Sequence, residues 1–309
     1  DVLAITHADN DHLCGFSDLF YLNHAQKYKS DERIKINELW VPSAVICGDE
    51  LEEEEAKILR AEARHRLKNK QGIKVFSRPE FIDDWFEEEG LNADDYADFF
   101  VDAGTLVPGL DIDSDGIEFF VHSPFASRQD DGTLVERNDC SIVVQCCFKS
   151  GDTITKFILG SDTAWEALEE IVNISKYHEN EERLQYDIFK LPHHCSYKTL
   201  SDDKGKDKTE PKEKVDWLFR QANTGAIIVA TCNPIPSEDT DQPPHRQAAK
   251  YYKDLMVELD GEFIVTMEYP KKAKPESIEI TIESTGSKLK KSTSGAAPYI
   301  SSVPSRRAG

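Results

Sequence analysis

Short apolar stretches of strand length recur along the chain and are separated by polar turns. Val, Ile, Phe and Cys are frequent in them, which is typical of β-strands in a protein core. The stretch over 141–148 is apolar at successive positions, so we expect a strand that is covered on both faces. The predicted strands cover residues 2–5, 39–41, 117–121, 141–148, 154–159, 186–191, 226–230, 263–267 and 278–282.

Three stretches between these strands repeat apolar residues at helical spacing, and they cover residues 49–70, 164–174 and 244–259. Pro244 stands at the start of the third, where a proline fits the first helical turn. Strands that alternate with helices predict one α/β domain with the strands inside and the helices outside.

Two segments differ in composition from this domain, which we place over residues 1–284. Residues 79–100 combine acidic and aromatic side chains, so we expect a small helical insertion there. Residues 285–309 are rich in Ser, Gly, Pro and Lys, and this composition predicts a disordered basic tail.

The net charge of −21 argues against binding to long nucleic acids through bulk charge. Residues 285–309 contain five basic residues and no acid, so the rest of the chain carries −26, which is −21 minus these five charges. Such a surface repels phosphate backbones and anionic membranes. A nucleotide that is bound through metal ions in a local pocket is still compatible with this charge.

Cysteine usage and hydropathy indicate a cytoplasmic protein that does not cross a membrane. The seven cysteines are odd in number, irregularly spaced and without a CxxC pair, which argues against a disulfide framework. No apolar run approaches the ~20 residues that span a bilayer. The chain begins at Asp1, beside an apolar stretch, so we expect further sequence upstream.

The sharpest polar cluster follows the first apolar stretch directly. It places His7, Asp9, Asp11 and His12 within six residues. Imidazole nitrogens and carboxylate oxygens are metal ligands, and a loop that follows a strand allows such side chains to converge. The cluster therefore favours a metal site. The alternative is a polar loop in which the Asp residues cap a helix.

Two later strand ends carry residues of the same type. The stretch over 154–159 leads to Asp162, and the stretch over 186–191 leads to His193 and His194. Taken separately, Asp162 could be a helix N-cap and the His pair a solvated turn. Taken together, the three strand ends predict ligands of one site.

In this order the three motifs resemble the signature of the metallo-β-lactamase-fold hydrolases: HxHxDH, a later Gly-x-Asp and a His in a final strand-loop. Within that superfamily the chain is most similar to the hydrolase domain of ComEC-type competence proteins, over roughly residues 1–285. The matching segments are 6–12, 138–141, 160–162 and 192–196. The resemblance implies an α/β fold of the metallo-β-lactamase-like αββα sandwich type, with its first strands upstream of Asp1.

The resemblance also implies two divalent metal ions, Zn²⁺ or Mn²⁺. His7 and Asp9 would bind one ion, with Asp9 in place of the second His of the commoner signature. Asp11 and His12 would bind the other ion, and Asp11 would also orient the attacking water as the catalytic residue. Asp162 would bridge the two ions.

The last ligand is left open between two residues. His194 aligns best because a small residue and a Ser follow it, but His193 could serve instead. Asn138 stands near the place of the family's usual third-motif His and could bind a metal weakly through its amide oxygen. Two further departures are Cys195, in place of the usual Gly, and Ser161, inserted between Gly and Asp.

Three more residues are candidates for the substrate pocket. His122 and His245 stand at places where the competence group also has His, although His245 could instead be a helix N-cap. Lys198 follows the His pair and could hold an anionic substrate, or it could simply be solvated.

The resemblance implies a metal-dependent hydrolase, and within the competence-type subgroup a phosphodiesterase or nuclease that uses a metal-bridged hydroxide. A short, cyclic or partner-delivered nucleotide would suit the acidic body. The alternatives are a hydrolase of a small ester, lactam or thioester, and a non-catalytic interaction module with a decayed metal site. The acidic insertion and charged loops suggest a protein partner, as in a bacterial defence system.

Overall fold

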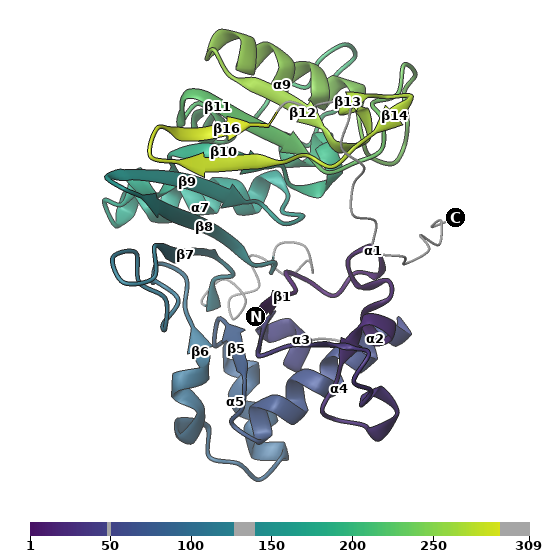
Figure 1. Ribbon diagram of the computed structural model, residues 1–309, viewed down its shortest axis with the longest axis vertical. Helices are drawn as coiled ribbons and strands as arrows, with labels where there is room; N and C mark the ends of the chain where they lie inside the picture. Colours follow the sequence, from purple (N-terminus) through teal and green to yellow (C-terminus); the bar gives the residue numbers. More distant parts are fainter. Residues whose placement is uncertain (48–50, 127–139, 291–309) are drawn as a thin grey trace.

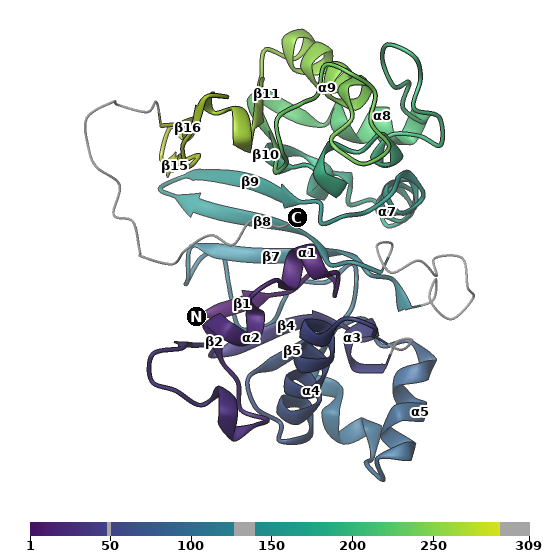
Figure 2. The same cartoon turned by 90° about the vertical axis from the view of Figure 1, so that its right-hand side faces the viewer.

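The computed structural model describes residues 1–47, 51–126 and 140–290. These residues form a mixed α/β protein with one parallel sheet, one mixed sheet and three two-stranded ribbons (Figure 1). The two larger sheets lie face to face, and helices cover the outer face of each of them (Figure 2).

The first part of the chain forms a parallel four-stranded sheet in the order β1-β4-β5-β6. Its strands are β1 (Val2–Ala4), β4 (Glu38–Pro42), β5 (Ile73–Phe76) and β6 (Phe100–Val101). The helices packed on it are α3 (Ser43–Cys47), α4 (Glu54–Lys68) and α5 (Glu80–Glu88). Buried apolar side chains from these helices and strands form one continuous core cluster.

The second sheet has six strands in the order β12-β11-β10-β9-β8-β7. They are β7 (Ile117–Ser123), β8 (Val143–Ser150), β9 (Thr153–Leu159), β10 (Tyr186–Lys190), β11 (Ala222–Ala230) and β12 (Glu262–Val265). The strands from β9 to β12 are parallel, whereas β7, β8 and β9 are antiparallel neighbours. A second core cluster joins this sheet to α7 (Trp165–Tyr177), α8 (Glu213–Phe219) and α9 (Arg246–Glu258).

A third apolar cluster holds the two sheets together. Trp40 and Phe76 from the first sheet contact the side chains of the second sheet in this cluster, and Val121 and Val144 are among the buried residues on the other side. Trp40 also meets Phe119 edge-on, with 5.1 Å between the ring centroids. Burial of such large side chains stabilises the contact between the sheets by about 1.5–3 kcal/mol each.

The smaller elements lie at the ends of the sheets. The helical ones are α1 (Asn10–Leu13), α2 (Phe16–Leu19), η1 (Gln26–Tyr28), η2 (Ala93–Phe99), η3 (Glu181–Leu184), η4 (His193–Cys195), η5 (Tyr197–Thr199) and η6 (Thr266–Glu268). The strand pairs are β2 (Phe20–Tyr21) with β3 (Ile34–Lys35), β13 (Pro270–Lys271) with β14 (Lys274–Pro275), and β15 (Ile280–Glu283) with β16 (Gly286–Leu289).

Each of the nine predicted strands overlaps an observed strand, and the three predicted helices overlap α4, α7 and α9. The segment 79–100 does contain a helix, α5, but its aromatic side chains belong to the core of the first sheet, and its last residue begins β6. The predicted tail over 285–309 starts too early, because Gly286–Leu289 pair with Ile280–Glu283. The rest of that tail, from residue 291, lies outside the described residues.

Candidate metal centre

Three strand ends from the two sheets meet at one place. Asp9, in the loop after β1, has an extended backbone, and the backbone N–H of Ile142, just before β8, donates to the carbonyl of Thr6 at 3.1 Å. β9 and β10 are parallel neighbours joined through α7, so their carboxyl ends lie at one edge of the sheet. The loops after these ends carry Asp162 and His194.

Four side chains from these segments form a compact cluster. Asp11, His12, Asp162 and His194 each offer a ligand atom, and the four atoms lie within 4.8 Å of one another. The Nε2 atom of His194 is 3.1 Å from both Asp11 Oδ2 and Asp162 Oδ2. The Nε2 atom of His12 is 3.4 Å from the same Asp162 oxygen. Two imidazoles and two carboxylates in this arrangement could hold a metal ion.

His7 and Asp9 border this cluster. The Nε2 atom of His7 is 4.0 Å from a carboxylate oxygen of Asp9 and 4.0 Å from one of Asp162. His7 is buried, and its other ring nitrogen, Nδ1, lies 3.0 Å from the Thr6 hydroxyl and 3.3 Å from the Ser161 hydroxyl. The structure thus places all four residues of the first motif beside Asp162.

Neither Asp9 nor Asp162 has the capping role that was the alternative for each. Asp9 is the N-cap residue of α1, but its side chain makes no capping hydrogen bond. The N-cap residue of α7 is Ala164, and the carboxylate of Asp162 faces His12 and His194 instead. Both acids therefore point to the cluster rather than to a helix terminus.

Two histidine ring nitrogens in or beside the cluster are buried and lack a hydrogen-bond partner among the described residues. Within the described part of the chain, the Nε2 atoms of His7 and His12 have no hydrogen-bond partner, and the same is true of Asp162 Oδ1. A buried polar atom without a partner destabilises a protein by about 1–3 kcal/mol. Several such atoms at one place indicate that a bound ligand satisfies them. A cation fits, because ring nitrogens and a carboxylate oxygen can all donate electron pairs to it.

The electrostatics of the cluster also favour a cation. Burial raises the pKa of Asp162, but the close approach of the His12 and His194 rings and the charge of Lys190 outweigh burial and hold that pKa well below its usual range. Asp162 is therefore ionised although it is almost fully buried. Burial and the neighbouring His12 lower the pKa of His7 to about 4, so His7 is neutral and able to act as a ligand.

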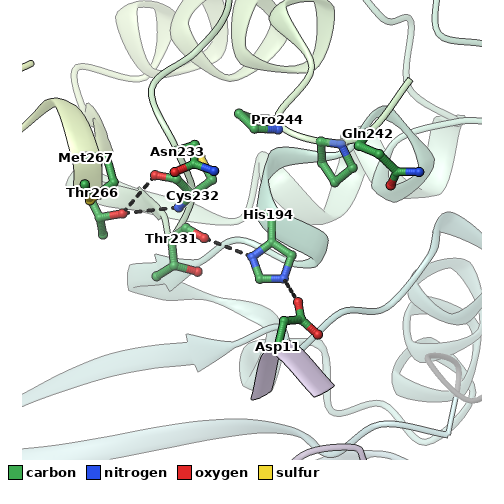
Figure 3. Close-up of a pocket in the computed structure, with 10 residues that line it drawn as sticks. Asp11, His194, Thr231, Cys232, Asn233, Gln242, Pro244, Thr266 and Met267 are labelled. Atoms are coloured by element: carbon green, nitrogen blue, oxygen red, sulfur yellow. Dashed lines mark hydrogen bonds and ion pairs between the residues drawn. The ribbon is translucent and has the colours of Figure 1, made fainter. Parts of the chain in front are cut away.

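His194 is oriented by a backbone group. Its Nδ1–H donates to the carbonyl oxygen of Thr231 at 3.0 Å, which turns Nε2 towards Asp11 (Figure 3). Histidines that bind metals commonly donate their second N–H in this way. The hydrogen bond with Asp162 raises the pKa of His194 to about 9, against the lowering effect of burial. A proton on His194 thus offsets the negative charge of Asp11 and Asp162. A metal ion bound at the same place would offset that charge as well.

The loop that carries His194 has an unusual backbone. His193, His194 and Cys195 all have positive φ angles, of 48°, 52° and 64°, and Ser161 opposite them has 53°. Residues with a Cβ adopt this region at a cost of about 1–3 kcal/mol each, and they cluster at functional sites. The backbone N–H of His193 donates to the Ser161 carbonyl at 3.2 Å and helps to hold the two loops together.

This geometry separates the two adjacent histidines. His194 is a member of the ligand cluster, whereas His193 is not. The Nδ1 atom of His193 is buried and has no hydrogen-bond partner among the described residues. Burial lowers the pKa of His193. Of the two, His194 is therefore the one whose position would allow it to bind a metal ion together with Asp11, His12 and Asp162.

The remaining predicted residues have different positions. His122 is not brought to the cluster: its Nε2 atom bonds to the carbonyl of Arg183 at 3.0 Å, its ring packs on Phe120, and it is 3% exposed. That prediction was wrong because the strand points this side chain into the core, where burial lowers its pKa to about 4. Asn138 lies outside the described residues.

His245 and Lys198 lie close to the His pair. His245 precedes α9 without capping it through its side chain. Its Nδ1 accepts the backbone N–H of Tyr197 at 3.3 Å, and its Nε2 is buried without a partner in the described chain. Lys198 is exposed, and its charge contributes to lowering the pKa of both His193 and His245. These contacts place both residues beside the candidate site.

Sequence reasoning missed two contributors to the site. The carbonyl of Thr231 orients His194, and a backbone carbonyl leaves no signal in the sequence. Lys190 was not among the predicted site residues, yet its Nζ atom donates to the Ser161 carbonyl at 3.0 Å and lies 3.7 Å from Asp162 Oδ1. Its position at the end of a strand beside the His pair was the available signal.

Comparisons with known proteins do not identify a family for this chain. No protein-family model matches the chain, and no curated protein matches it. In the part of the chain that the structure describes, no helix has both the length and the apolar character needed to cross a bilayer.

Proposed function

We propose that this chain is a metal-dependent hydrolase of the metallo-β-lactamase type that cleaves phosphodiesters. The observation that carries the proposal is the meeting of Asp11, His12, Asp162 and His194, from three separate segments, within 4.8 Å. Two facing sheets with helices on both outer faces are compatible with the αββα sandwich of that superfamily.

The donor set supports a site for two ions. Asp11, His12 and His194 would hold one ion, and His7 and Asp9 would hold the other, with Asp162 between them. The buried Nε2 atoms of His7 and His12, which have no hydrogen-bond partner among the described residues, fit this role. The mixture of oxygen and imidazole donors suits Zn²⁺ and Mn²⁺. When bound, such a pair activates water near neutral pH and stabilises negative charge on the reacting group.

The protein's own groups have distinct tasks in this proposal. Asp11 is the most exposed carboxylate of the cluster, so it can reach the attacking water and accept its proton. Lys190 holds the Asp162 carboxylate and the Ser161 carbonyl, which fixes the loop after β9. Thr231 keeps His194 in one ring orientation.

Phosphodiester chemistry is favoured by charge. Lys198 carries a positive charge close to His193 and His245, and it could contact an anionic phosphodiester beside the cluster. The overall charge of −21 disfavours long nucleic acids, so the proposal is restricted to short or cyclic nucleotide substrates.

The test combines metal analysis with substrate profiling on the purified protein. We expect bound Zn²⁺ or Mn²⁺ and hydrolysis of bis(4-nitrophenyl) phosphate, with no turnover of nitrocefin. Asp11→Ala and His12→Ala should each abolish hydrolysis and keep the circular dichroism spectrum of the folded protein. Absence of metal at neutral pH would support a decayed site, and turnover of nitrocefin alone would support lactam chemistry. Either result contradicts the proposal.

A further inference from the structure

An open cavity of about 540 Å³ adjoins the candidate metal centre. Asp11 and His194 form its floor, so whatever occupies it lies beside the cluster (Figure 3). Its volume is in the range of about 300–1,000 Å³ that is typical of small-molecule sites. The other residues that line it are Thr231, Cys232, Asn233, Gln242, Pro243, Pro244, Thr266 and Met267.

Among the described residues that line this cavity there is no Lys or Arg. Asp11 and His194, on the floor, are the ionisable residues in this described lining apart from the thiol of Cys232, whose pKa burial raises to about 12. An anionic group inside the cavity would therefore meet no compensating cation from the walls. The cavity suits an uncharged part of a substrate whose charged group lies at the metal centre.

Two amide side chains stand on different walls. Asn233 follows β11, and Gln242 lies in the segment before α9; Figure 3 shows them on either side of the space above His194. Both residues are exposed, and in the described chain neither side-chain amide has a hydrogen-bond partner. An amide offers a donor and an acceptor together, which is the pattern that pairs with the edge of a nucleobase.

Apolar surfaces lie next to these amides. Pro243, Pro244 and Met267 contribute them, and a methionine sulfur makes favourable contacts with a flat aromatic ring. The wall after β11 is held firmly, because the Thr266 hydroxyl accepts from the Cys232 N–H and donates to the Cys232 carbonyl, both at 3.2 Å. A flat heteroaromatic ring that carries donors and acceptors on its edge matches both kinds of surface.

We infer that this cavity binds the nucleoside of the substrate, with Asn233 and Gln242 reading the base edge and the phosphate lying at the metal centre. The inference rests on the proposed function, because it assigns the charged group to that centre. It adds a binding site for the base: the base enters the cavity and contacts Asn233 and Gln242.

Binding measurements by calorimetry on the metal-loaded full chain test this, with adenosine, adenosine 5′-monophosphate, ribose 5-phosphate and inorganic phosphate as probes. We expect the nucleotide to bind at least about tenfold more tightly than ribose 5-phosphate. Asn233→Ala and Gln242→Ala should each weaken nucleotide and adenosine binding about fivefold, as expected for the loss of one hydrogen bond. Both should leave the affinity for inorganic phosphate within twofold.

Gln71→Ala is the matched control, since Gln71 is an exposed amide between α4 and β5 and does not line the cavity. It should change no affinity. Equal binding of the nucleotide and ribose 5-phosphate, or unaltered nucleotide binding in both amide variants, would overturn the inference. Adenosine carries no phosphate, so its binding supports the cavity even if the protein hydrolyses nothing. Conversely, hydrolysis of bis(4-nitrophenyl) phosphate without any nucleoside preference would leave the proposed function standing and refute this inference.

Discussion

Replacing His194 with Ala should remove most of the metal affinity, whereas His193→Ala should not. The Nε2 atom of His194 lies 3.1 Å from carboxylate oxygens of Asp11 and Asp162, and Thr231 orients the ring. His193 is the adjacent residue, has the same chemistry and also has a positive φ angle, so it is a closely matched control. A difference in metal affinity between the two variants therefore reports the position of the imidazole and not the mere loss of a histidine.

The expected size follows from linkage between binding and folding. Changes around a metal ligand weaken binding about 10–100-fold, so loss of the ligand itself should reach at least about 100-fold. At a metal concentration about 1,000 times the wild-type Kd, the ion stabilises the fold by about 4.1 kcal/mol; a 100-fold weaker site retains about 1.4 kcal/mol. The metal-dependent stabilisation should therefore fall by about 2.7 kcal/mol, or roughly 4 °C in Tm for a chain of this length.

The measurement is the difference in Tm with and without Zn²⁺ or Mn²⁺, for the wild type and both variants. The absolute Tm of His194→Ala also reports the loss of its hydrogen bonds with Asp162 and Thr231, so only the metal-dependent difference is compared. In His193→Ala that difference should stay within about 1.4 kcal/mol, a factor of ten in Kd, of the wild-type value. If His193→Ala loses the metal-dependent shift and His194→Ala keeps it, the ligand assignment is refuted.

Three further predictions concern the scaffold. Glu62→Gln should destabilise the fold by about 3–5 kcal/mol in urea unfolding, because Glu62 is fully buried and pairs with Arg66 at 2.7 Å and with the His24 backbone N–H at 2.9 Å; a loss below 1 kcal/mol would contradict this. Burial raises the pKa of Glu62, but the hydrogen bonds that its carboxylate accepts lower that pKa by more than burial raises it. The folded pKa therefore lies below the unfolded value of 4.5. The Glu62 contribution should thus be complete above pH 4.5 and decline as the pH falls through the folded pKa, and stability measured against pH should be flatter in Glu62→Gln over that acid range. Gly160→Ala should cost about 1–3 kcal/mol and weaken metal binding, because its Cβ would lie 2.7 Å from the Pro192 ring; wild-type metal affinity in this variant would argue against tight packing of the two site loops.

The sequence predicted the elements with strong local patterns and missed those that depend on partners. β5 (Ile73–Phe76) is a four-residue strand directly after a long helix, and β6 (Phe100–Val101) is a two-residue strand defined by its pairing with β5. α3 (Ser43–Cys47) consists of apolar and small residues that continue the pattern of the preceding strand. Tertiary contacts select these conformations, and the local pattern of apolar and polar residues does not reveal such contacts.

The site divides in the same way. Side chains of metal-ligand type that follow predicted strands, such as His7, Asp162 and His194, were predicted, and the structure brings them together. The sequence could not distinguish His193 from His194 as the ligand, because the distinction depends on a hydrogen bond from His194 to the carbonyl of Thr231, more than 30 residues away in the chain. His122 was misassigned because its place after a strand resembles the place of a ligand, whereas its ring faces the core.

The position of the centre across two sheets has a mechanical consequence. Asp11 and His12 follow a strand of the first sheet, whereas Asp162 and His194 follow neighbouring strands of the second. The proposed ion, held by all four residues, would be bound by both sheets at once, so its binding free energy would add to the apolar contact that Trp40 and its neighbours already provide. Removal of the ion should then weaken the contact between the sheets before it weakens either sheet alone. Amide hydrogen exchange should accordingly increase first in the segment from β1 to α1 and at the start of β8, where the Ile142 N–H donates to the Thr6 carbonyl, and uniform acceleration across both sheets would contradict this order.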